Sequence, residues 1–143
     1  MHIMVHSLDQ IQSFFPDTTK KNVLIRIEEK PTLLTPFYED VLHLSFSDIT
    51  QEEYDDLRGQ GLSRGFQLFS ITDAKKVLQF VNQHLDADVL HIHCHAGKSR
   101  SAAMGIGIQR ILGLPDDAIQ FRNAPIIPNE TVLNILLHAA NRA

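Results

Sequence analysis

The sequence of 143 residues contains a single cysteine, Cys94, and no tryptophan. One cysteine cannot close a disulfide within the chain, so the composition fits a reducing compartment and leaves Cys94 as either an inert buried thiol or a nucleophile. The N-terminus has no basic region followed by a long apolar core, and no stretch reaches the apolar length of a membrane span. We therefore expect a cytoplasmic protein without a membrane-spanning segment.

An excess of positive charge is also missing. The chain has 13 Lys and Arg residues against 17 Asp and Glu residues, which gives a formal net charge of −4. This balance does not favour nucleic acid as a partner, although it leaves room for a local basic pocket. The sequence shows no internal repeat, linker or low-complexity tract, and its length suits one domain over residues 1–143.

Strand-like and helix-like segments alternate along the chain, which predicts an α/β fold with a central, mainly parallel sheet flanked by helices. Apolar and β-branched runs predict strands at residues 2–6, 22–28, 41–46 and from Val89 onwards. Capping signals and helical periodicity predict helices at residues 8–15, after Thr50, at 71–85 behind a Thr72 cap, at 100–112, at 115–122 and from Glu130, with an irregular connection between Pro31 and Pro36.

Two chemically interesting residues come directly after predicted strands. Asp48 follows the strand at residues 41–46, and Cys94 follows the strand that begins at Val89. Ligands of parallel sheets gather beyond the carboxyl ends of the strands, so both residues should lie at one edge. Cys94 also precedes a helix that begins near Arg100, and a loop between a strand and a helix is where backbone N–H groups can bind an anion.

The loop after Cys94 has the composition of a phosphate-binding loop. A phosphoester dianion needs several donors that converge on its oxygens, and the loop amides together with the planar Arg100 guanidinium can supply them. Gly97 lets the backbone approach the anion without a Cβ in the way. The same positive surroundings favour the thiolate form of Cys94, which is the useful nucleophile. The substrate-binding candidates are therefore His95, Ala96, Gly97, Lys98, Ser99 and Arg100.

The pattern His-Cys, five residues, Arg-Ser resembles the signature of the cysteine-dependent protein phosphatases, the tyrosine and dual-specificity superfamily. His93, Cys94, Gly97, Arg100 and Ser101 match it. The resemblance covers most of residues 41–137, because small dual-specificity members also carry an Asp after an upstream strand and a Pro-Asn pair in the tail, here Asp48 and Pro128-Asn129.

The resemblance implies a phosphatase that works through a phosphocysteine intermediate and needs no cofactor. Cys94 would be the nucleophile and Arg100 would bind the phosphoryl group. Asp48 would act as general acid and then as general base. Ser101 would stabilise the departing thiolate, and His93 would order the loop through hydrogen bonds.

Other carboxyl groups compete with Asp48 for the role of the acid. An Asp before a helix is often only a cap, and the spacing from Asp48 to Cys94 is longer than in compact family members, so residues 51–65 would be an insertion. Asp73 lies in the first turn of a predicted helix, where a carboxylate offsets the macrodipole. The competing residues are Asp40, Asp55, Asp56 and Asp73.

A metal site and a nucleotide site are both disfavoured. His91, His93 and His95 alternate on one predicted strand face, but alternate ligands on one strand are rarely arranged tetrahedrally around one ion, so we expect no metal. The triplet from Gly97 to Ser99 resembles a nucleotide P-loop, yet the glycine that this motif requires five positions earlier is Ile92.

The substrate class stays open at this stage. Lys98 and His95 make the loop more basic than in many protein phosphatases, and a Lys at this position also occurs in family members that act on phosphoinositides. Lys98 could equally point to solvent. The expected partner is a phosphorylated protein or a small phosphoester. A phosphate-reading pseudophosphatase is the remaining alternative, and the oligomeric state is left open.

Overall fold

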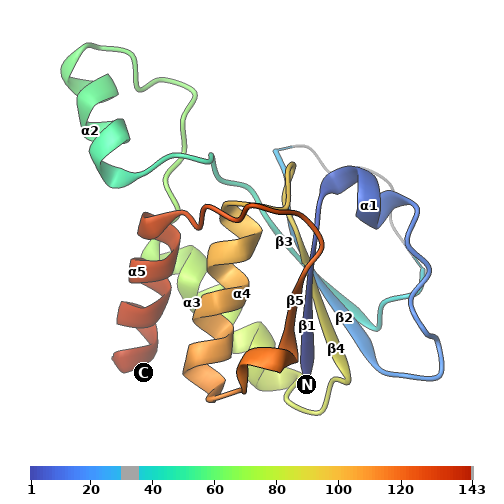
Figure 1. The fold of residues 1–143 in the computed structure, drawn as a ribbon. Coiled ribbons are helices and arrows are strands. Elements are labelled where there is room, and N and C mark those ends of the chain that lie inside the picture. Colours follow the sequence, from blue (N-terminus) through green and yellow to red (C-terminus); the bar gives the residue numbers. More distant parts are fainter. Residues whose placement is uncertain (30–35, 143) are drawn as a thin grey trace.

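The computed structural model describes residues 1–29 and 36–142. Five parallel strands form one sheet in the order β3-β2-β4-β1-β5, which confirms the predicted α/β fold (Figure 1). Pro31 lies outside the described residues. The elements are β1 (His2–His6), α1 (Leu8–Gln12), β2 (Asn22–Ile27), β3 (Asp40–Leu44), α2 (Gln51–Gly59), α3 (Ile71–Gln83), β4 (Val89–His93), α4 (Arg100–Leu112), the single turn Asp116–Ala118, β5 (Ile119–Phe121) and α5 (Glu130–Asn141).

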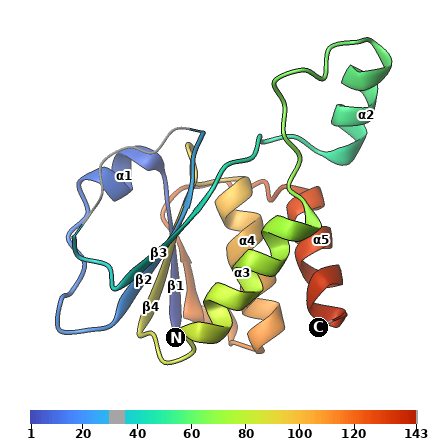
Figure 2. The same cartoon turned by 180° about the vertical axis from the view of Figure 1, so that it is seen from behind.

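The centre of the sheet forms because its strands are apolar enough to be covered on both faces. Every residue of β2 is buried, as expected for an inner strand of a parallel sheet. Helices α3, α4 and α5 cover one face, and α1 lies on the other (Figures 1 and 2). A Cβ at Gly107 of α4 would lie 2.7 Å from the Leu136 Cδ2 atom, so glycine lets α4 approach α5 closely.

The predicted helix at residues 115–122 is wrong. Its capping signals produce only the single turn Asp116–Ala118, and the chain then continues as β5, in which Ile119 pairs with Ile3 of β1. A free edge of β1 therefore overrides the local helix signal. Two other boundaries shift: α1 already ends at Gln12, and α3 is capped by Ser70 rather than by Thr72.

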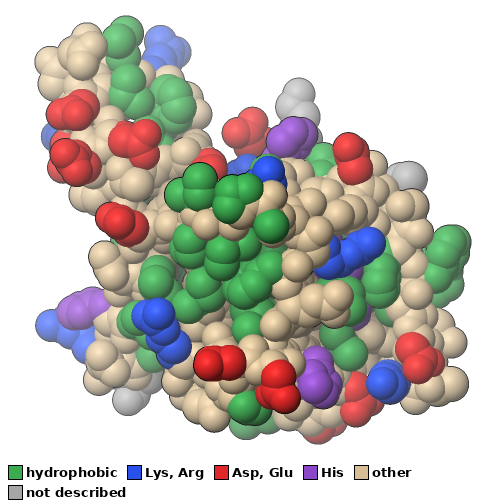
Figure 3. All heavy atoms as spheres, in the orientation of Figure 1, with side chains coloured by type: hydrophobic (Ala, Val, Ile, Leu, Met, Phe, Trp, Pro, Cys, Tyr) green, Lys and Arg blue, Asp and Glu red, His purple; other side chains and the backbone are tan. Residues whose placement is uncertain are grey.

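Residues 48–66 leave the body of the molecule as an arm that contains α2 (Figures 1 and 2). Ser47 and Gln67 close its base, because the Ser47 N–H donates to the Gln67 carbonyl at 2.7 Å and the Gln67 N–H donates to the Ser47 hydroxyl at 2.9 Å. No residue of α2 is buried, and acidic side chains gather on the arm (Figure 3). Asp48 thus lies at the base of the arm, beside the sheet edge.

The described helices include none long and apolar enough to cross a membrane.

Candidate functional site

Residues 94–99 connect β4 to α4 at the carboxyl edge of the sheet, and they fold around the sulfur of Cys94. The Gly97 N–H donates to Cys94 Sγ at 3.2 Å, and the Ser101 hydroxyl lies 3.0 Å from the same sulfur. Cys94 is only 2% exposed. The Gly97 N–H and the Ser101 hydroxyl therefore both contact the sulfur, and Ser101 belongs to the first turn of α4.

Gly97 is required by the shape of this loop. Its φ is +70°, in the left-handed region, and an added Cβ would lie 2.7 Å from the carbonyl carbon and oxygen of His6. The loop is also fixed near its start, because the Leu8 N–H donates to the His95 carbonyl at 3.0 Å. The end of β1 and the beginning of α1 therefore hold the loop in place from one side.

Arg100 is the first residue of α4, and the nitrogen atoms of its guanidinium have different surroundings. Nη1 donates to the Phe46 carbonyl at 2.9 Å, which ties the helix to the chain that follows β3. The buried Nε has no hydrogen-bond partner within the described residues. A cation at a helix N-terminus is unfavourable without an anion nearby, so an anion bound beside Arg100 would offset this charge.

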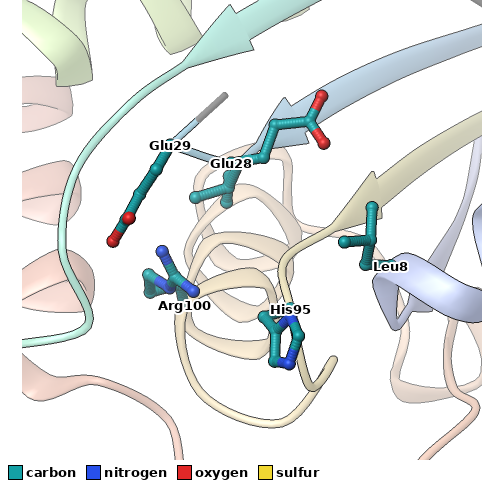
Figure 4. A pocket seen from close by; sticks show the side chains of 6 residues that line it. Leu8, Glu28, Glu29, His95 and Arg100 are labelled. Carbon is teal, nitrogen blue, oxygen red and sulfur yellow. The ribbon is translucent and has the colours of Figure 1, made fainter. Parts of the chain in front are cut away.

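A cavity of about 340 Å³ opens beside the loop (Figure 4). Arg100 and His95 line it from the loop side, and Glu28 and Glu29 line it from the chain that follows β2. Glu28 is buried and forms an ion pair of 2.9 Å with Arg26, whereas Glu29 is exposed. Cys94 itself is 2% exposed and is not among the residues that line this cavity, so the cavity reaches the loop at His95 and Arg100.

Asp48 is held against the same loop, as the strand-end argument predicted. Its Oδ1 accepts hydrogen bonds from the Ser99 hydroxyl at 2.8 Å and from Asn129 Nδ2 at 3.0 Å. Ser99 is the residue before α4, so the end of the loop and the chain after β3 meet through this carboxylate. Asp48 itself is exposed, which leaves it open to a bound molecule.

The competing aspartates lie on other elements. Asp73 forms a capping box with Ser70 at the start of α3, and Asp40 lies 2.8 Å from His84 Nε2. Asp55 accepts from the Gln51 side chain on α2. Asp56 also belongs to α2, on the projecting arm. Of the five aspartates, Asp48 is the one whose carboxylate contacts the loop.

His93 is fully buried behind the loop. Its Nδ1 lies 3.4 Å from the Cys94 carbonyl oxygen. Burial lowers the pKa of His93 to about 4, against the opposing influence of the Glu28 carboxylate. The imidazole is therefore neutral near pH 7 and supports the loop without adding positive charge to it.

The three alternating histidines do not share one strand face. β4 ends at His93, so His95 lies in the loop and is exposed. The buried His91 side chain contacts residues of the two neighbouring strands: its Nδ1 lies 3.0 Å from His6 Nε2, and its Nε2 lies 2.9 Å from Asn22 Oδ1. No group of metal-ligating side chains occurs in the part of the chain that the structure describes.

Two features of the site escaped sequence reasoning. The sequence points to Asn129 only as part of the Pro-Asn pair, whereas in the structure its side chain caps α5 and contacts Asp48. Glu28 and Glu29 directly follow β2 at the carboxyl edge. The sequence predicts this strand to run to Glu28, one residue longer than β2, so the strand-end rule points to Glu29 but places Glu28 inside the strand.

Comparison with protein-family models, with curated proteins and with solved structures found no match to this chain. The resemblance to cysteine-dependent phosphatases therefore depends on the sequence motif alone.

Proposed function

We propose that this protein is a phosphomonoester hydrolase of the cysteine-dependent tyrosine or dual-specificity type. One observation carries the proposal: the Cys94 sulfur sits between the Gly97 N–H and the Ser101 hydroxyl, at the start of the helix that bears Arg100. A nucleophile, an anion-binding loop and a cation with an orphaned buried donor thus meet at one point. A mere phosphate reader would need no nucleophile there.

The first chemical step transfers the phosphoryl group to the enzyme. The Cys94 thiolate attacks phosphorus, an S–P bond forms, and the P–O bond to the leaving group breaks. Asp48, in its protonated form, gives its proton to the leaving oxygen. The loop amides and Arg100 stabilise the charge that spreads over the three equatorial phosphoryl oxygens.

The second step returns the enzyme to its starting state. A water molecule attacks the phosphocysteine, and the Asp48 carboxylate accepts a proton from it. The S–P bond breaks, inorganic phosphate is released, and the sulfur leaves as a thiolate. The Gly97 N–H and the Ser101 hydroxyl receive this charge, since both already lie within hydrogen-bonding distance of Sγ. His93 keeps the loop in shape from behind.

The cavity favours substrates with one phosphate group, such as a phosphorylated side chain of a protein. Glu29 is an exposed carboxylate on its wall, and a second phosphate group on the substrate would be repelled there. A phosphoinositide or another polyphosphorylated small molecule is therefore the second candidate. The basic side chain of Lys98 is the reason for considering this second candidate. The Lys98 backbone has a separate contact, because its carbonyl accepts from the Ile127 N–H at 2.9 Å.

Hydrolysis of p-nitrophenyl phosphate in EDTA and reductant tests the proposed function. We expect release of p-nitrophenol and phosphate without added metal, because Arg100 and the loop amides supply the stabilising charge. Turnover that appears only with a divalent metal, or no turnover under any of these conditions, would contradict the proposal.

Gly97→Ala should lower this activity by at least about tenfold, because alanine is strained at positive φ and its Cβ would collide with the His6 backbone. Gly113→Ala is the matched control: Gly113 also has a positive φ, of +66°, but nothing lies within 4 Å of an added Cβ. It should lose some thermal stability and keep its activity. Equal activity losses in both variants would mean that backbone strain at a positive φ lowers the activity and that the shape of the loop at Gly97 has no specific role.

Glu29→Gln should change the choice between substrates. Removal of the carboxylate should raise the rate on a phosphoinositide relative to a singly phosphorylated peptide by roughly threefold to tenfold. Glu52→Gln, on the exposed α2, provides a control that removes the same charge from the arm. An unchanged ratio in Glu29→Gln would mean that the cavity wall does not select the substrate.

A further inference from the structure

The side chain and backbone of Asn129 join three parts of the site. Asn129 is 5% exposed and caps α5, where its Oδ1 accepts from the N–H groups of Thr131 and Val132 at 3.1 and 3.2 Å. Its Nδ2 donates to Asp48 Oδ1 at 3.0 Å and to the Ile49 carbonyl at 3.2 Å. Its backbone N–H donates to the carbonyl of Ser99, the last loop residue, at 3.2 Å.

This network fixes the orientation of the Asn129 amide. If Oδ1 and Nδ2 were exchanged, the oxygen would face the Asp48 carboxylate and the Ile49 carbonyl, and the NH₂ group would face two N–H donors. All four contacts would be lost at once, so only the observed orientation satisfies them. Because the Asn129 oxygen accepts from the start of α5, the NH₂ group must point toward Asp48 and donate to it.

The first turn of α5 also contacts the chain that follows Asp48, in addition to the contact between Asn129 and Asp48. The Gln51 N–H, at the start of α2, donates to the Thr131 hydroxyl at 2.8 Å. The chain from Asp48 to Gln51 is thus attached to α5 at both of its ends. This matters because the arm that follows has no buried helix residue to anchor it.

Both side-chain hydrogen bonds to Asp48 end on the same oxygen. Ser99 and Asn129 donate to Oδ1, which fixes the carboxyl group and directs the proton to Oδ2. A protonated carboxyl group donates from one oxygen only, so an acid held this way presents its proton in a defined direction. Orientation of this kind contributes to catalysis because proton transfer needs a donor within hydrogen-bonding reach of the leaving oxygen.

We propose that Asn129 is a positioning residue that orients Asp48 for proton transfer to the leaving group. The inference rests on the proposed function, and it adds a residue whose contribution is confined to the acid step. Attack by Cys94 and phosphate binding by Arg100 should not depend on it. The change should therefore be largest for substrates whose leaving group needs a proton most.

Asn129→Ser is the principal test. Serine is also a favoured helix cap, so the start of α5 is preserved, but its shorter side chain cannot reach Asp48. We expect kcat/KM for an alkyl phosphate to fall roughly tenfold or more, and that for p-nitrophenyl phosphate to fall less than about threefold, since nitrophenolate leaves without much help from an acid. Asn134→Ser makes the same substitution at an exposed position of α5 and should change neither rate.

A double-mutant cycle separates positioning from general damage. Asp48→Asn removes the acidic proton and should slow the alkyl phosphate more than Asn129→Ser does. If Asn129 acts through Asp48, adding Asn129→Ser to Asp48→Asn should cause little further loss. Equal losses for both substrates in Asn129→Ser, or the same loss in the presence and absence of Asp48, would overturn the proposal.

Asn129→Asp provides a readout that a structural role would not move, and it serves if the serine variant does not fold. Aspartate keeps the cap and the size of the side chain but places a second carboxylate beside Asp48. Like charges favour the protonated form of a carboxyl group, so the alkaline limb of the kcat/KM profile should move to higher pH. An unmoved limb would count against the contact.

The cycle also distinguishes this proposal from the proposed function. If Asp48→Asn leaves alkyl phosphate hydrolysis unchanged while the enzyme remains active, the acid assignment fails and the positioning role fails with it, whereas the Cys94 chemistry stands. If Asp48→Asn has its expected effect and Asn129→Ser has none, only the positioning role fails.

Discussion

Cys94→Ser should lower the turnover of p-nitrophenyl phosphate by about 10⁴-fold or more, because a serine hydroxyl at this position is not ionised near pH 7 and cannot replace a thiolate as nucleophile. The donors that surround the sulfur belong to Gly97 and Ser101, and the substitution leaves them in place. The variant should therefore still bind inorganic phosphate or a phosphopeptide, as measured by calorimetry.

Turnover and phosphate binding of Cys94→Ser together distinguish a nucleophile from a structural thiol. Loss of turnover with retained binding and an unchanged circular dichroism spectrum assigns the nucleophile. Turnover within about tenfold of the wild type would exclude a covalent role for Cys94. Loss of binding together with turnover would mean that the thiol maintains the loop, which its burial also allows.

Arg100→Lys should produce the second largest effect, a fall in kcat/KM of about 10²-fold to 10³-fold. The guanidinium donates from Nη1 to the Phe46 carbonyl, and its buried Nε has no hydrogen-bond partner among the described residues. An ammonium group is a point charge on a flexible stem and cannot hold the Phe46 carbonyl and an anion in one plane. Affinity for phosphate should fall as well, since the same group acts in the ground state and the transition state.

Arg110→Lys is the matched control for this substitution. Arg110 lies in the last turn of α4, on an exposed position, so the same exchange there should leave kinetics and phosphate affinity unchanged. If Arg100→Lys retained the wild-type kcat/KM, the planar fork would have no role and the cavity would need only a positive charge.

The layout of the sheet could be predicted because it depends on patterns that are local. β2 and the strand before Cys94 are both rich in apolar, β-branched residues, although Arg26 lies within β2 and His91 within β4, and this local composition predicts each strand without knowledge of its neighbours. β5 could not be predicted this way. It is three residues long, and Ile119 is in a strand because it pairs with Ile3, which is a tertiary fact.

The candidate site shows the same division. The loop at Cys94 and its proximity to Asp48 follow from the rule that strand ends share one edge. The contact between Asn129 and Asp48 could not be predicted, since the two residues are 81 positions apart and their contact depends on how α5 lies against the base of the arm. The Asn129 oxygen caps α5, whereas the contacts with Asp48 and Ile49 use the Asn129 NH₂ group.

Rapid acid quench of the enzyme during turnover, followed by mass spectrometry of the peptide that contains Cys94, tests the central claim most directly. We expect a phosphoryl group on Cys94 in the wild type and none in Cys94→Ser. Steady turnover with no phosphoryl group on Cys94 at any quench time would contradict the central claim.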